Sequence, residues 1–302
     1  MVKNEEMNHA SLKKFLSELS FSHPVVQLSY IGESVLGREI PLVTLGEQNA
    51  PKSVLYVATH HACESICTSL LIKFLTEYVS LYEKNGSSYQ ININALHKMR
   101  KIYIVPMINP DGVEYRLNGV GENNPIRERV IAYNGGEDFS LWQANARGVD
   151  LNHNYNAFFD EYKELEKERG ITQGRTKFSG EYPESEPETA ALCNLIRYIL
   201  PTLEGVITLH TQGEEIYYSS RGKLPKKSVH VSKILSKMTR YNLCEPSDTA
   251  CYGGLTDYLI TTHDIPSFTV ECGRGTNPLP YDMLGKIYTD VREMLFTFPI
   301  LF

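Results

Sequence analysis

The sequence predicts an α/β fold in which strands and helices alternate within a single domain. Short apolar runs rich in β-branched and aromatic residues end at polar turn signals. Longer segments between these runs carry apolar residues at helical spacing, the pattern of a sheet covered by helices. A chain of 302 residues suits one large α/β domain, and no linker, repeat or low-complexity tract divides it. We therefore expect residues 1–302 to form one domain.

The composition excludes several other classes of protein. A hydrophobic content of 42% and a charged content of 22% are ordinary for a globular chain. No apolar run reaches the roughly 18 residues that cross a bilayer, and the net charge of −6 argues against nucleic-acid binding. The first 20 residues lack the apolar core of a secretory signal. We expect a cytoplasmic protein, with the cell envelope as the alternative if a leader has been removed; the oligomeric state stays open.

The strand–helix order can be followed along the chain. Residues 1–20 are expected to form an N-terminal helix. A strand at 53–59 ends in His60-His61 and is followed by a helix at 64–83. Further strands are predicted at 101–108, 205–210 and 267–271, each ending at a Gly- or Asn-containing turn. Further helices are predicted at 185–200, where Ser185 and Glu188 have capping-box spacing, and at 228–241 and 281–296. The charged run 160–170 is expected at the surface, and 115–148 is expected to form long loops.

Metal-ligating and acidic side chains follow three of these strands. His61 and Glu64 come after the first, His210 ends the third, and Glu271 ends the fourth. The carboxyl ends of neighbouring strands in an open α/β sheet meet at one edge, where ligands bind. Two imidazoles and a carboxylate form one of the standard catalytic zinc sets, which leaves a fourth position for water. We therefore predict one Zn²⁺ held by His61, Glu64 and His210, with Glu271 as general base.

Other interpretations of these residues stay open at this point. An H-x-x-E pattern arises by chance in many proteins, and histidines are often hydrogen-bonded structural residues. His60 competes with His61, but it leaves the opposite face of the strand end. Six scattered cysteines form no C-x-x-C pair, which favours buried thiols. Cys63 and Cys67 lie beside the predicted site, and small core residues are the favoured interpretation for both.

Eight segments, in order, resemble the zinc carboxypeptidase family of metallopeptidases across nearly the whole chain. They are IGESVLGREIPLVTLG at 31–46, THHACES at 59–65, INPDG at 108–112, GVDLNHNY at 148–155, the segment 178–189, LHTQGEEIYY at 209–218, GGLTDY at 253–258 and FTVECGRG at 268–275. The resemblance implies a mixed sheet of about eight strands flanked by helices. HTQGEEIYY and ECGRGTNPLP are more similar to one branch, the bacterial γ-D-glutamyl-diamino acid endopeptidases, which cut cell-wall peptides.

The chain departs from the exopeptidases of that family in three places. The arginine that follows the tryptophan corresponding to Trp142 is Gln143 here. The Asn-Arg pair that holds the substrate's C-terminal carboxylate is Asn152-His153, and imidazole does not replace a guanidinium fork without loss. Those exopeptidases carry a mobile tyrosine four residues before the Gly-Gly pair. That position is Thr249 here, and Tyr252 lies nearby in the sequence.

These departures leave the oxyanion and substrate contacts to other candidates. Arg147 and Gln143 are candidates for a second electrophile beside zinc. The candidate substrate-binding residues are Asn152, His153, Gln212, Arg221, Tyr252, Asp257 and Arg274.

The expected activity is hydrolysis of the γ-D-glutamyl-diamino acid bond of bacterial muropeptides. Two other enzymatic interpretations stay open: an ordinary metallocarboxypeptidase that releases C-terminal L-residues, and a small-molecule amide hydrolase on the same scaffold. A binding module without catalysis is the alternative from another class, and the intact metal set and Glu271 disfavour it. The expected partner is a peptide or muropeptide substrate.

Overall fold

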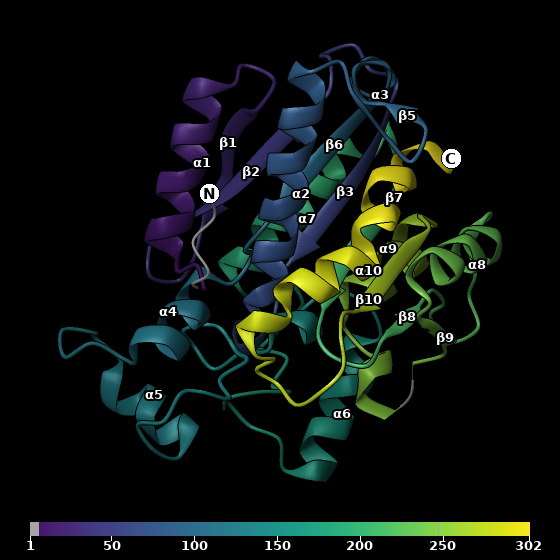
Figure 1. Ribbon diagram of the computed structural model, residues 1–302. Coiled ribbons are helices and arrows are strands. Elements are labelled where there is room, and N and C mark those ends of the chain that lie inside the picture. Colours follow the sequence, from purple (N-terminus) through teal and green to yellow (C-terminus); the bar gives the residue numbers. More distant parts are fainter. Residues whose placement is uncertain (1–5, 247) are drawn as a thin grey trace.

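The computed structural model describes residues 6–246 and 248–302. Within these residues, eight strands form one mixed sheet in the order β1-β2-β6-β3-β7-β10-β8-β9 (Figure 1). The strands are β1 (Gln27–Glu33), β2 (Glu39–Leu45), β3 (Lys52–Ala58), β6 (Arg100–Val105), β7 (Leu203–His210), β8 (Glu215–Tyr217), β9 (Asn242–Cys244) and β10 (Ser267–Glu271). A separate short hairpin pairs β4 (Ser87–Ser88) with β5 (Ile91–Asn92).

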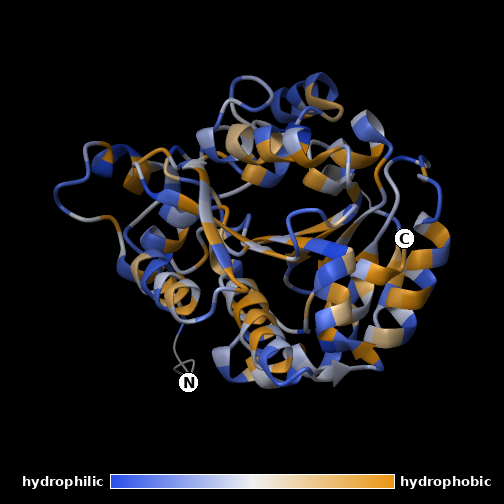
Figure 2. Cartoon of the chain, turned by 90° about the horizontal axis from the view of Figure 1, so that it is seen from above, coloured by the Kyte–Doolittle hydropathy of each residue, from blue (hydrophilic) through white to orange (hydrophobic). Residues whose placement is uncertain are grey.

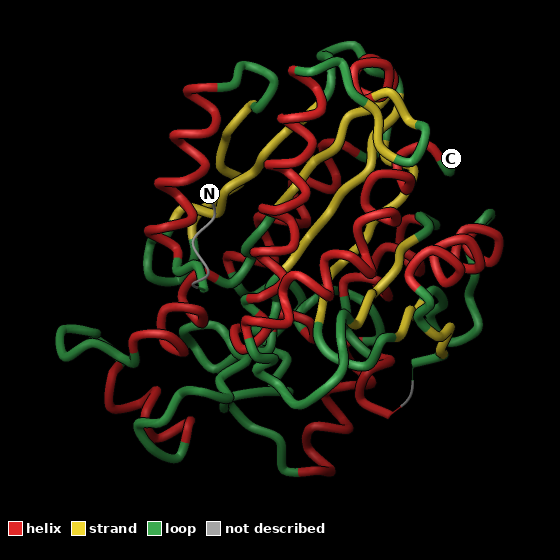
Figure 3. Tube along the Cα trace, viewed as in Figure 1, coloured by secondary structure: helices red, strands yellow, loops and turns green. Residues whose placement is uncertain are grey.

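The four central strands β6, β3, β7 and β10 run parallel to one another. The outer strands β1 and β2 pair antiparallel, as does β2 with β6 and β8 with β10. Parallel neighbours place their carboxyl ends on the same edge of the sheet. Loops gather at that edge (Figure 3).

Helices cover both faces of the sheet, because alternate strand residues point to opposite sides. Val54 and Tyr56 of β3 join a core with α1, α2, α3, α8 and α10, whereas Leu55 and Val57 join a second core with α7 and α9. Apolar residues accordingly concentrate on the strands and the facing sides of the helices (Figure 2). These helices are α1 (His9–Ser22), α2 (Ile66–Glu83), α3 (Ile93–Met99), α7 (Pro187–Ile199), α8 (Ser228–Thr239), α9 (Leu255–His263) and α10 (Leu284–Thr297).

The predicted fold class is confirmed, with corrections at the level of single elements. The segment 115–148, predicted as loops, contains the last four residues of α4 (Pro110–Asn118) and all of α5 (Arg127–Asn134). The charged run, expected at the surface, forms the helix α6 (Phe159–Arg169), and most of its charged residues are exposed. The capping box is absent: Glu186 occupies the N-cap of α7 without a side-chain capping bond. The N-terminal helix begins at His9, and residues 1–5 of the predicted helix lie outside the described residues.

Candidate active site

The site is built on the ends of three adjacent parallel strands. His61 lies just beyond β3, His210 is the last residue of β7, and Glu271 is the last residue of β10. The Cα atoms of His210 and Glu271 are register partners in the ladder between β7 and β10. A short 3₁₀ turn over Ala62–Glu64 then brings Glu64 back towards the strand end. The strand register and this turn together therefore bring the four residues to one edge of the sheet.

The two imidazoles face the two oxygens of one carboxylate. His61 Nδ1 lies 2.9 Å from Glu64 Oε1, and His210 Nδ1 lies 3.0 Å from Glu64 Oε2. Burial by itself would raise the pKa of Glu64, but the neighbouring His61 and His210 rings outweigh it and lower the pKa to about 2. The carboxylate is therefore ionised and ready to act as a ligand.

The donor set fits a divalent transition metal. The ligand atoms of His61, Glu64 and His210 all lie within 4.8 Å of one another, so one ion can contact all three. Two imidazole nitrogens with a carboxylate suit zinc, and three protein ligands leave a fourth position for water, as in catalytic zinc sites. His60 lies behind the cluster, where its Nε2 is 2.8 Å from the Tyr155 hydroxyl and its ring stacks on His210.

Asp150 orients His61 from the far side of its ring. His61 Nε2 lies 3.2 Å from Asp150 Oδ1, which leaves Nδ1 of the same ring as the ligand atom. Asp150 also accepts backbone N–H groups from Asn152 at 3.1 Å and Lys177 at 2.9 Å. Burial opposes its charge, but His61 and these hydrogen bonds hold the pKa of Asp150 well below its usual range.

Replacing Asp150 with Asn is expected to weaken zinc binding by about 10–100-fold, because the carboxylate that makes His61 more basic loses its charge. Competition between the protein and a chelator of known affinity measures the effect. Asp138→Asn is the control, since Asp138 is exposed and lies outside the site. An unchanged zinc affinity in Asp150→Asn would assign Asp150 a purely structural role.

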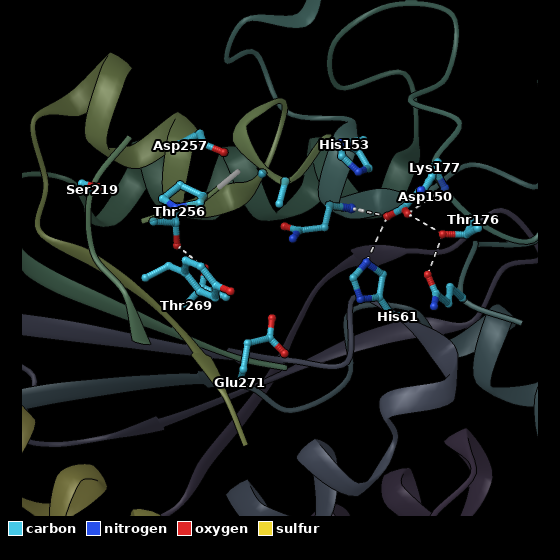
Figure 4. A pocket seen from close by; sticks show the side chains of 16 residues that line it. His61, Asp150, His153, Thr176, Lys177, Ser219, Thr256, Asp257, Thr269 and Glu271 are labelled. Atoms are coloured by element: carbon cyan, nitrogen blue, oxygen red, sulfur yellow. Dashed lines mark hydrogen bonds and ion pairs between the residues drawn. The ribbon is translucent and has the colours of Figure 1, made fainter. Parts of the chain in front are cut away.

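Glu271 stands in the wall of the pocket beside His61 (Figure 4). Its carboxyl oxygens have no hydrogen-bond partner within residues 6–246 and 248–302. Burial and the nearby Glu64 carboxylate raise the pKa of Glu271 well above its usual range. A carboxyl group with a raised pKa takes up a proton readily. Because the oxygens of Glu271 have no hydrogen-bond partner in the described residues, the group can act as a general base and then as an acid.

The pocket around these residues encloses about 230 Å³. His61, Asp150, Thr176 and Lys177 lie on one side of it, and Ser219, Thr256, Asp257 and Thr269 on the other (Figure 4). Of the residues predicted from the sequence, six line this pocket: His61, Gln143, Asn152, His153, Asp257 and Glu271. The remaining lining residues are Asp150, Thr176, Lys177, Tyr217, Ser219, Pro246, Ala250, Gly254, Thr256 and Thr269.

Gln143 presents an amide to the pocket. The Thr176 hydroxyl donates to Gln143 Oε1 at 2.6 Å, so the amide nitrogen is directed away from that contact. An amide N–H can donate to a carbonyl oxygen that gains negative charge. Thr176 was not predicted from the sequence, because nothing near it in the chain marks it as a neighbour of Gln143.

Arg147 does not reach this pocket, which corrects its assignment as a second electrophile. Its guanidinium lies 3.5 Å from the buried Glu186 carboxylate and lines a different cavity, with Phe178 and Tyr182. The chain turns between Gln143 and Arg147, where Asn145 Oδ1 accepts from the backbone N–H groups of Arg147 and Val149. A spacing of four residues therefore does not place Arg147 on the same side as Gln143.

Four further candidates are not among the residues that line this pocket: Gln212, Arg221, Tyr252 and Arg274. Gln212 Oε1 accepts from the Gly275 amide at 3.1 Å, and Arg274 is exposed 3.7 Å from Glu214. Arg221 is ion-paired with Glu161 and covers the Tyr252 ring. The side chain of Thr249 lies outside the described part of the chain.

His153 is buried in the pocket wall with its ring stacked on Tyr162, at a centroid distance of 4.4 Å and an interplanar angle of 2°. Its Nδ1 donates to the Tyr252 carbonyl at 2.7 Å. Gly253 packs against the same turn with φ of +68°, and a Cβ there would lie 2.4 Å from the His153 carbonyl oxygen. Only glycine tolerates that approach.

The family model described as zinc carboxypeptidase matches residues 12–294 of the chain. This match spans the sheet, the metal-ligand cluster and Glu271.

The chain belongs to the zinc carboxypeptidase family.

Members of this family are zinc metallopeptidases, and the chain is such a hydrolase. It is 33% identical over 289 residues to gamma-D-glutamyl-L-diamino acid endopeptidase 1 of Lysinibacillus sphaericus, covering 95% of this chain and 70% of that one. It is also 33% identical to the uncharacterized protein YqgT of Bacillus subtilis, over 95% of this chain and 75% of the other. Bovine thrombin-activatable fibrinolysis inhibitor, solved with tick carboxypeptidase inhibitor, has the same zinc carboxypeptidase fold, with a TM-score of 0.70 at 19% identity over 95% of this chain and 94% of that one.

Among the described residues of this family member, no helix combines the length and apolarity that crossing a membrane requires.

Proposed function

We propose that this metallopeptidase hydrolyses the γ-D-glutamyl amide bond to a diamino acid in bacterial cell-wall peptides. The observation that carries the proposal is the buried carboxylate of Asp257, which forms no ion pair with the described residues and lies in the pocket that holds Glu271 and His61. Asp257 accepts from the Ser220 hydroxyl, and Arg221, whose charge acts on Asp257, is ion-paired with Glu161. The second amino group of a diamino acid supplies the missing positive charge. The activity for which the Lysinibacillus relative is named supports the same substrate class.

The reaction follows from the placement of the side chains. His61, Glu64 and His210 would hold zinc, which when bound would supply the Lewis acidity that makes water a nucleophile near neutral pH. Glu271 accepts the proton from that water as its oxygen bonds to the γ-carbonyl carbon. Gln143 donates to the carbonyl oxygen as negative charge develops there. Glu271 then gives the proton to the amide nitrogen as the C–N bond breaks, which releases the diamino acid with a free amine.

A hydrolysis assay with L-Ala-γ-D-Glu-meso-diaminopimelate beside a hippuryl carboxypeptidase substrate tests this proposal. We expect zinc-loaded protein to cleave the γ-D-glutamyl bond, and we expect chelator to abolish the cleavage. Cleavage of the hippuryl substrate alone would assign an ordinary carboxypeptidase. Failure on both substrates would contradict the proposal and favour a small-molecule hydrolase or a binding module.

The recognition of the diamino acid is expected to depend on pH through Asp257. Burial raises the pKa of this carboxyl to about 6, so it is ionised above pH 6 and protonated below. KM for the diaminopimelate peptide should therefore rise as pH falls through 6. Other groups titrate as well, so the measurement is the ratio of KM values between this peptide and its 2-aminopimelate analogue, which lacks the distal amine. In Asp257→Asn the ratio should be near one and independent of pH, and a wild-type ratio that stays flat would contradict the assignment.

A further inference from the structure

We infer that Asn277 is a positioning residue that holds the Glu64 carboxylate in place for the metal ion. Asn277 is partly buried and lies in the loop that follows Glu271 at the end of β10. Its side-chain amide contacts Glu64 and also Thr211, the residue after His210. One side chain therefore contacts a predicted metal ligand and the chain neighbour of another. The inference concerns the metal site and does not depend on which peptide bond the enzyme cleaves.

Thr211 fixes which end of the Asn277 amide faces Glu64. The Thr211 carbonyl oxygen can only accept, so the amide atom that lies 2.7 Å from it is Nδ2. The amide oxygen Oδ1 in turn accepts from the Thr211 hydroxyl at 2.7 Å. An amide nitrogen carries two hydrogens, and the second is left for Glu64 Oε1, which lies 3.4 Å from Nδ2. Asn277 therefore presents a donor to the carboxylate.

The loop that carries Asn277 is held in place by contacts other than the one to Glu64. The Gly213 N–H donates to the Gly273 carbonyl at 2.8 Å, and the Gly275 N–H donates to Gln212 Oε1 at 3.1 Å. These contacts join the loop after β10 to the segment after β7. A donor that is positioned by its surroundings in this way can orient the group that accepts from it.

The contact matters most when a metal ion is bound. Among the described residues, three nitrogens contact the Glu64 carboxylate oxygens: His61 Nδ1, His210 Nδ1 and Asn277 Nδ2. An imidazole nitrogen that binds a metal uses its lone pair and has no hydrogen to donate. Neither ring can then donate to Glu64 through Nδ1, and the Asn277 N–H remains as a donor. Carboxylates that ligate a metal are themselves held by hydrogen bonds of this kind.

Metal binding by Asn277→Ala tests the inference without any substrate. The variant loses the donor to Glu64, so zinc should bind about 10–100-fold more weakly in competition with a chelator of known affinity. The visible absorption bands of protein loaded with Co²⁺ should also change, because they report how the ligands surround the ion. A merely structural role for Asn277 would lower the melting temperature of the metal-free protein and leave the cobalt spectrum unaltered.

Thr211→Val is the matched control. It removes the hydroxyl that contacts Asn277 Oδ1, but it keeps the backbone carbonyl that holds Nδ2 and thus keeps the donor to Glu64. Its zinc affinity and cobalt spectrum should therefore match those of wild type. If Thr211→Val weakened zinc binding as strongly as Asn277→Ala, the amide would serve to anchor the loop and the inference would be wrong.

A crystal structure of the zinc-loaded wild-type protein gives a test that needs no variant. Asn277 Nδ2 should lie within about 3.2 Å of a Glu64 carboxylate oxygen. A clearly longer separation, or wild-type zinc affinity in Asn277→Ala, would overturn the inference. A wild-type protein that binds zinc but cleaves no γ-D-glutamyl bond would instead remove the proposed function and leave this inference standing.

Discussion

Replacing Glu271 with Gln is expected to lower kcat by about 10²–10⁴-fold, the range that a positioned general acid–base contributes. The amide has almost the same size and stays at the end of β10, but it cannot take a proton from water. Because Glu271 is not among the ligand cluster of His61, Glu64 and His210, the zinc content should be unchanged. KM should change little, since the same pocket wall remains.

Steady-state kinetics and metal analysis of the same preparation check this prediction. Glu204→Gln is a suitable control, because Glu204 lies near the opposite end of neighbouring β7, ion-paired with Lys52, and should leave kcat unaltered. A Glu271→Gln protein that has lost its zinc would contradict the separation between base and ligands. A Glu271→Gln protein that retains nearly full kcat would show that another group transfers the proton.

Replacing Glu64 with Ala is expected to abolish both zinc binding and hydrolysis. The Glu64 carboxylate stands between the two Nδ1 atoms, and without it two imidazoles remain, one fewer than the three protein ligands of a catalytic zinc site. Zinc that binds only the folded protein stabilises it by about 2.7 kcal/mol at 100 times its Kd. Wild-type protein should therefore melt at a higher temperature in zinc, and Glu64→Ala should not respond.

Cys63→Ala provides the matched control for this experiment. Cys63 is buried next to Glu64 in the sequence, and it is not a member of the cluster formed by the ligand atoms of His61, Glu64 and His210. Its alanine variant should keep stoichiometric zinc and the thermal response. Loss of zinc in Cys63→Ala, or retention in Glu64→Ala, would overturn the proposed ligand set.

The metal-free protein should also lose stability in acid through Glu64. Its pKa is about 2 in the folded protein and near 4.5 when unfolded, so its charged form stabilises the fold. That contribution is fully present above pH 4.5 and is lost as pH falls through 2. Acid titration of unfolding in wild type and Glu64→Ala, both stripped of metal, measures the difference; identical acid limbs would contradict it.

The sequence by itself determined the strand ends and the chemistry placed on them. The apolar runs of β3, β7 and β10 stop at polar residues, and parallel strands bring their carboxyl ends to one edge. His61, His210 and Glu271 could therefore be grouped from local patterns alone. Glu64 could be added to the group as well, because three residues along a tight turn return to the strand end.

Only the tertiary structure decided which loop residues meet at that edge. Asp150 and Thr176 lie far from His61 in the chain, and their contacts depend on how the loops before α6 and α7 pack. The same packing turns Arg147 to Glu186 and away from Gln143. Periodicity encodes the direction of strand and helix side chains, but loops have no such period. The role of a loop residue is therefore set by long-range packing, as with His153, whose proton position depends on a carbonyl 99 residues away.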